Sequence, residues 1–134
     1  MSTMTRNISD KKQYGVFYTP KRVADILCDW AIQSESDRVL EPSFGGCDFL
    51  GASLARFREI GVTDNIASEQ ISGCDIDENA FTFLREIIPN ANGHFRKADF
   101  LTLTLSSFPL VENGFDVVVG NPPYVSHHNM AESQ

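Results

Sequence analysis

Apolar residues recur along the chain with two different periods, which predict helices alternating with short strands. Three groups of apolar residues have helical spacing. They are Val23, Ile26, Leu27, Trp30 and Ala31; Leu50, Leu54, Phe57 and Ile60; and Ala80, Phe81, Leu84, Ile87 and Ile88. We therefore expect three helices, each with one apolar face. The first should be capped by Thr19 with Pro20 in its first position, and the third should end at Pro89.

Four shorter apolar segments lie between or after these helices and are expected to form strands. They are residues 38–40, 71–77, 94–100 and 115–119. Because strands and helices alternate, the sequence predicts an α/β fold with a parallel sheet and helices on its faces.

Polar residues stand at or just beyond the carboxyl ends of all four expected strands. They are Glu41, Asp75, Asp99 and Asn121. In open α/β sheets, ligands bind outside this edge. The four residues are therefore candidates for one shared site.

A glycine-rich turn joins the first expected strand to the second helix and contains Gly45 and Gly46. Nucleotide-like ligands are usually held at a turn of this kind, although any tight turn can use glycine. Asp75 ends the next strand, where an acid hydrogen-bonds ribose hydroxyls in βαβ units. Asp77 is expected to cap the helix that follows.

Asn121, Pro122, Pro123 and Tyr124 follow the last expected strand. Consecutive prolines lack backbone donors and hold the chain extended, so their carbonyl oxygens stay free to accept hydrogen bonds. Asn121 adds a side-chain acceptor and Tyr124 a flat ring. Together they suit a planar heterocycle that carries an amino group. The same residues also fit a strand that simply ends in a proline-rich turn.

The composition indicates one soluble globular domain: 134 residues, 42% hydrophobic and 22% charged. No apolar run approaches the roughly 20 residues that span a bilayer, and the polar N-terminus does not resemble a signal peptide. We expect a cytoplasmic protein that does not bind membranes. Residues 1–13 show no periodicity and are expected to form a flexible arm, with residues 14–134 forming the domain.

The net charge of −7 disfavours contact with phosphates over most of the chain. Only the segment 1–22 carries an excess of Lys and Arg, and a solvated arm is the commoner meaning of such a cluster. The three cysteines form no CxxC pair, so we expect reduced, mostly buried thiols. His127 and His128 have no further ligands beside them, and we expect no metal site.

In this order, the motifs resemble those of the adenine-N6 DNA methyltransferases, which use S-adenosylmethionine and include the modification enzymes of restriction systems. The cofactor loop precedes the Asn-Pro-Pro-Tyr segment, as in the gamma class, and the resemblance covers roughly residues 15–125. It implies a Rossmann-like methyltransferase fold and a complete enzyme that acts on double-stranded DNA.

The resemblance also implies cofactor-binding roles for Tyr18, Thr19, Pro20, Glu41, Pro42, Ser43, Gly45, Asp75, Ile76, Asp99 and Phe100. In that family, Glu41 would lie near the methionine amino group and Asp75 would bind the ribose. Ile76 and Phe100 would flank the adenine of the cofactor. The chain departs from the family pattern at Cys47, where glycine is usual and where a side chain could crowd the loop.

The catalytic residues implied by the resemblance are Asn121, Pro122, Pro123 and Tyr124. The side chain of Asn121 and the carbonyl of Pro122 would accept the hydrogens of adenine N6 and direct its lone pair toward the sulfonium methyl. The adenine would leave the duplex to reach the site, and Tyr124 would stack on it.

The chain ends ten residues after Tyr124, so we expect an incomplete sheet without a target-recognition domain. We expect the chain to be inactive on DNA by itself, with a bare last strand that can pair with another copy. One alternative is a methyltransferase for RNA or for a protein glutamine, although the Phe17 to Pro20 segment favours DNA. A second alternative is a remnant without catalytic activity that only binds cofactor or pairs with another chain.

Overall fold

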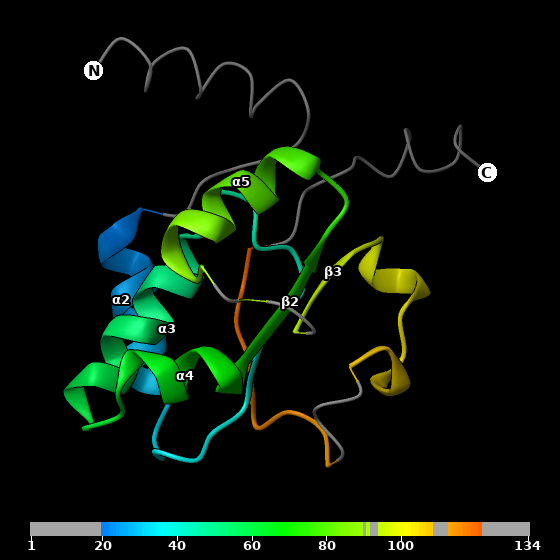
Figure 1. Ribbon diagram of the computed structural model, residues 1–134. Coiled ribbons are helices and arrows are strands. Elements are labelled where there is room, and N and C mark those ends of the chain that lie inside the picture. The colour runs from blue at the N-terminus through cyan, green and yellow to red at the C-terminus, as the bar shows by residue number, and fades with distance from the viewer. Residues whose placement is uncertain (1–19, 90, 92–93, 109–112, 122–134) are drawn as a thin grey trace, which may run out of the picture.

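Four short parallel strands form the centre of the fold (Figure 1). The computed structural model describes residues 20–89, 91, 94–108 and 113–121. Its strands are β1 (Val39–Glu41), β2 (Ile71–Asp75), β3 (Phe95–Lys97) and β4 (Val117–Val118). They lie in the order β3-β2-β1-β4, with every neighbouring pair parallel. The predicted α/β fold with a parallel sheet is confirmed.

Helices connect or precede these strands. They are α2 (Lys21–Ala31), α3 (Asp48–Glu59), α4 (Asp64–Gln70) and α5 (Glu78–Ile87), together with the 3₁₀ turns η1 (Phe100–Thr102) and η2 (Leu105–Ser107). All four predicted strands are present. β1 has the expected length but is shifted by one residue, and the other three strands are shorter than expected. Helix α4 was not anticipated, because its seven residues place only one side chain, Ala67, in the core.

The four helices cover one face of the sheet (Figure 1). Val39 is paired in register with Ile71 and with Val117, so these side chains point to the same face, where they join the helices in the main core. Leu40 points to the opposite face and packs against Phe108, with Leu103 and Phe115 beside it. The apolar faces predicted for α3 and α5 are turned toward the main core.

The apolar face predicted for the first helix is not the face that α2 buries. Ala24 and Cys28 are its buried residues, whereas Trp30 is 79% exposed and Val23, Ile26 and Leu27 are also exposed. The reason is that α2 packs on α3, and the Cys28 thiol lies 3.5 Å from the Ser53 hydroxyl oxygen. A close approach of two helices requires small side chains at their contact.

The start of α2 and the end of the third strand also differ from the prediction. Pro20 occupies the N-cap position, one residue before the first helical residue, and Thr19 lies outside the described residues. β3 ends at Lys97, because the Asp99 side chain accepts a hydrogen bond from the Leu101 amide and starts η1.

Strand β4 borders only β1 within the described part of the chain, and Val118 is 61% exposed. The backbone amide of Val119 donates a 3.0 Å hydrogen bond to the carbonyl of Leu40, which aligns the ends of these two strands. Among the described residues, no helix is long and apolar enough to cross a membrane.

The packing of α2 predicts that enlarging its small residues destabilises the chain more than removing its large ones. Ala24→Leu should lower the free energy of unfolding by about 1–3 kcal/mol, because it overfills the α2–α3 contact. The matched change Trp30→Gln should alter it by less than about 0.5 kcal/mol. Urea unfolding of both variants measures this. A larger loss from Trp30→Gln would show that α2 packs through its other face.

Candidate functional site

The carboxyl ends of β1 and β4 lie side by side, where the order of the sheet reverses. From β1 the chain continues outward through β2 to β3, and it then returns to place β4 on the other side of β1. Ligands of open α/β sheets bind at such a switch point. Glu41 ends β1 on one side of it, and Asn121 follows β4 on the other.

Asp75 fastens the glycine-rich loop to the end of β2. One of its carboxylate oxygens accepts a 2.8 Å hydrogen bond from the Gly45 amide, and the other accepts a 2.8 Å bond from the Asp77 amide. The side chain of Asp77 in turn accepts a bond from the Asn79 amide and caps α5, as predicted. Each carboxylate oxygen of Asp75 has capacity for a second donor, such as a ribose hydroxyl.

Glu41 is the most deeply buried carboxyl of the site, with 1% of its surface exposed. Its Oε1 accepts a 2.9 Å hydrogen bond from the Ser43 amide. Among the described residues, no Lys, Arg or His forms an ion pair with it. Burial, partly offset by the Ser43 hydrogen bond and reinforced by the nearby charge of Asp75, raises the pKa of Glu41 from 4.5 to about 8. The site therefore holds a buried acid that has no cationic partner in the described part of the chain.

The loop between β1 and α3 is built on two left-handed residues, Gly45 (φ 45°) and Cys47 (φ 69°). The thiol of Cys47 is buried in the main core, 2% exposed, so it does not project into the space above the loop. A non-glycine residue in this conformation costs roughly 1–2 kcal/mol, which the burial of the side chain offsets. Burial also raises the pKa of Cys47 to about 12, which leaves an unreactive thiol.

Apolar side chains flank the acids at this edge of the sheet. Ile76, directly after β2, is 67% exposed, and Phe100, after β3, is also exposed. Asp99 is exposed beside Phe100 and caps η1. Exposed large apolar residues next to a polar site are a surface on which a planar ring can lie.

The structure describes most, but not all, of the predicted site. Pro42 and Ser43 are half-buried in the loop, and Pro20 is exposed at the start of α2. Asn121 is the last described residue and is exposed. The predicted residues Tyr18, Thr19, Pro122, Pro123 and Tyr124 lie outside the described residues.

Sequence reasoning missed Gly120, which adjoins Glu41 across the switch point. A Cβ atom at Gly120 would overlap Glu41 Oε1 and lie 3.1 Å from Glu41 Cδ. The sequence shows a glycine directly before Asn121, which could have drawn attention to this position. It does not show that β4 lies next to β1, and the contact with Glu41 depends on that arrangement.

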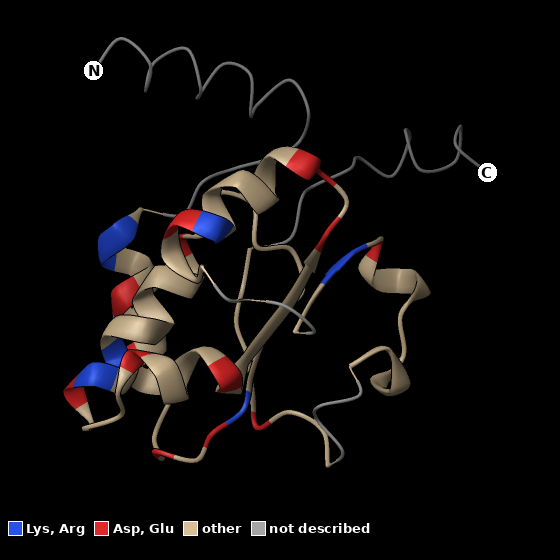
Figure 2. Cartoon of the chain, viewed as in Figure 1, with Lys and Arg blue, Asp and Glu red and all other residues tan. Residues whose placement is uncertain are grey.

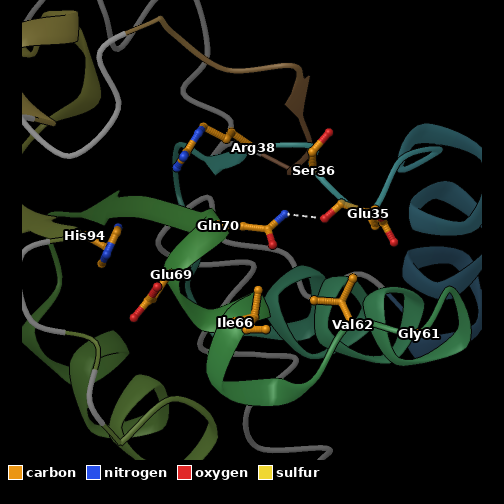
Figure 3. A pocket seen from close by; sticks show the side chains of 9 residues that line it. All are labelled: Glu35, Ser36, Arg38, Gly61, Val62, Ile66, Glu69, Gln70 and His94. Carbon is orange, nitrogen blue, oxygen red and sulfur yellow. Dashed lines mark hydrogen bonds between the residues drawn. The ribbon is translucent and has the colours of Figure 1, made fainter.

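A cavity of about 820 Å³ lies at the opposite edge of the sheet (Figure 3). Arg38, Gln70 and His94 line it, and each directly precedes a strand, so the cavity is at the amino ends. Burial lowers the pKa of His94, which keeps its ring neutral, and the Gln70 amide is bonded to two backbone carbonyls. Neither Glu41, nor Asp75, nor the loop between β1 and α3 lines this cavity, so it is separate from the site at the switch point.

Comparison with known proteins identifies similar sequences along nearly the whole chain. A sequence model of the family described as N-6 DNA Methylase matches residues 3–134. The type II methyltransferase M.VspI of Vibrio sp. (strain 343) is 31% identical over 121 residues, covering 87% of this chain and 27% of that protein. M.PaeR7I of Pseudomonas aeruginosa, also a type II methyltransferase, is 32% identical over 133 residues, covering 83% of this chain and 23% of that protein.

A solved structure supports the fold. It is a modification subunit assigned to a type I restriction enzyme from Vibrio vulnificus YJ016, with a TM-score of 0.67 and 21% identity. The match covers 93% of this chain and 27% of that one. The chain thus spans about a fifth to a quarter of the length of the curated relatives it matches.

The burial of Glu41 predicts that stability falls as pH rises. Its pKa is raised from 4.5 to about 8, so the folded chain keeps a proton that the unfolded chain releases between these values. The protonated Glu41 contributes its full stabilisation below pH 4.5, where both the folded and the unfolded chain carry the proton. Across it, the free energy of unfolding should decrease by up to about 1.4 kcal/mol per pH unit.

Urea unfolding from about pH 5 to about pH 9 measures this slope, which Glu41→Gln should remove. His94 titrates equally in both proteins, so the difference between them isolates Glu41. The same substitution at the exposed Glu35 is the matched control and should retain the slope. Equal slopes in the wild type and Glu41→Gln would contradict the raised pKa.

Proposed function

The chain belongs to the N-6 DNA methylase family, and on that premise we propose that it carries the methyl-donor pocket and catalytic loop of an adenine-N6 DNA methyltransferase. The proposed enzyme uses S-adenosylmethionine and belongs to a restriction-modification system. One observation carries the proposal. The buried acid Glu41, the loop held by Asp75, and Asn121 converge on the switch point of the sheet.

The site fits the proposed donor in charge and shape. Glu41 lacks a cation among the described residues, and the ammonium group of the methionine moiety supplies one. Asp75 retains capacity for the ribose hydroxyls, and Ile76 and Phe100 offer exposed apolar surface for the adenine. Pro42, Ser43 and Gly45 would line the donor along the loop, and Asp99 would bind its adenine.

The proposed chemistry is a direct transfer. When bound, S-adenosylmethionine supplies an electrophilic methyl group on a sulfonium centre. Asn121 would accept a hydrogen bond from N6 of the target adenine through its side-chain oxygen, with the carbonyl of Pro122 accepting the second hydrogen. This localises the N6 lone pair, which is otherwise delocalised into the ring. Tyr124 would stack on the flipped base.

The charge at this edge suits the donor better than it suits a phosphate backbone. Acidic residues lie where β2 leads into α5, namely Asp75, Asp77 and Glu78 (Figure 2). The Lys97 ammonium lies 3.7 Å from the Glu78 carboxylate. Acidic groups repel phosphates and attract a cationic sulfonium. We therefore propose that surfaces beyond this chain bind the double-stranded DNA and that the isolated chain is inactive on it. We also propose that the enzyme is cytoplasmic, where both S-adenosylmethionine and DNA are present.

The proposal predicts that Asn121→Ala in the full-length protein removes catalysis but not donor binding. Methyl transfer to duplex DNA should fall by about 100-fold or more, because the N6 lone pair loses a positioned acceptor. The dissociation constant for S-adenosylmethionine, measured by calorimetry, should change by less than about threefold.

Asn65→Ala, on the exposed surface of α4, is the matched control and should leave both quantities unchanged. Transfer to RNA or to a protein glutamine in preference to DNA would contradict the proposed substrate. A wild-type protein that binds no S-adenosylmethionine would contradict the proposal altogether.

A further inference from the structure

Gly120 is packed against the carboxyl group of Glu41. A Cβ atom there would overlap Oε1 and would lie 3.1 Å from Cδ and 3.2 Å from Oε2. Among the described glycines, only Gly45, Gly61 and Gly114 have a positive φ, so the backbone conformation does not require glycine at position 120. Glycine is required there because a side chain would occupy the space that the carboxyl group fills.

Neither partner of this contact can easily move away. The Ser43 amide holds Glu41 Oε1 at 2.9 Å, and the side chain is nearly fully buried. On the other side, the bond from the Val119 amide to the Leu40 carbonyl fixes the chain one residue before Gly120. A methyl group at position 120 must therefore displace the carboxyl group or push the chain after Val119 off the end of β1.

We propose that Gly120 is a positioning residue, whose bare Cα seats the Glu41 carboxyl group and thereby sets Asn121 at a fixed place beside the methyl-donor pocket. The inference rests on the proposed function, because the contact between Glu41 and Gly120 joins the residue that would bind the donor to the residue beside the catalytic asparagine. Glu41 holds the donor from one side, and its carboxyl group supports the residue next to Asn121 from the other. The position of the acid and the position of the catalytic loop are then linked.

The test is a double-mutant cycle on donor binding in the full-length protein. Gly120→Ala should weaken S-adenosylmethionine binding about tenfold or more, because the displaced carboxyl group no longer faces the donor. Glu41→Asp should weaken it by a similar factor, because the shorter side chain holds the acid farther back. In the double variant the shorter acid leaves room for the added methyl group. The double variant should therefore bind S-adenosylmethionine only about tenfold more weakly than the wild type does. Independent effects would multiply to a loss of about a hundredfold.

Gly51→Ala is the matched control, since a Cβ atom at Gly51 meets nothing within 4 Å and the residue lies within α3. It should leave donor binding unchanged. Steady-state kinetics give a second reading. Gly120→Ala should raise KM for the donor and also lower kcat, whereas a smaller fraction of folded protein would lower only the apparent kcat.

Urea unfolding without donor tests the contact independently of the proposed function. Gly120→Ala should be destabilised, and adding Glu41→Asp should recover part of the loss. If Gly120→Ala does not fold, recovery of folding in the double variant supports the contact, and failure to recover overturns it. Two results would overturn this inference and leave the proposed function standing. In the first, the wild type binds the donor and Gly120→Ala binds it equally well. In the second, the loss of affinity in the double variant equals the product of the two single losses. A wild type that binds no donor would overturn the proposed function as well.

Discussion

The carboxylate of Asp75 is the interaction on which the geometry of the site depends. It joins the end of β2 to the loop after β1 through the Gly45 amide and to the start of α5 through the Asp77 amide. Because both bonds are made to backbone groups, they fix the path of the chain and not merely one side chain. The left-handed residues Gly45 and Cys47 then turn the chain into α3, which packs in the main core.

Glu41 contrasts with Asp75, although both acids end neighbouring strands. Asp75 holds the loop and the start of α5 through two backbone bonds, whereas Glu41 accepts one backbone bond, is buried, and has its pKa raised to about 8. A buried acid without a cation costs stability, and such a cost is typical of a binding site that a ligand completes. The two acids therefore differ: Asp75 anchors the loop, whereas Glu41 has no cationic partner among the described residues.

The sequence predicted the elements better than it predicted their contacts. Apolar periodicity located α3 and α5 correctly, because both pack a wide apolar stripe on the sheet. It misjudged α2, whose contact with α3 uses Ala24 and Cys28, since close helix packing selects small residues that carry little periodic signal. Alternating strands and acids correctly predicted that Glu41 and Asp75 end neighbouring strands at one edge of the sheet. The contact between Gly120 and Glu41 was invisible in the sequence, because it exists only once β4 lies beside β1.

The most direct measurement is a titration of the isotope-labelled full-length protein with S-adenosylmethionine, followed by the backbone amide shifts in its NMR spectra. If the carboxyl edge of the sheet is the donor pocket, the amides of Ser43, Gly45 and Asp77 shift, since they are bonded to the acids that would receive the donor. The amides of Gly61 and Glu69, beside the cavity at the amino edge, stay in place. Shifts confined to that cavity, or none at saturating donor, would contradict the account.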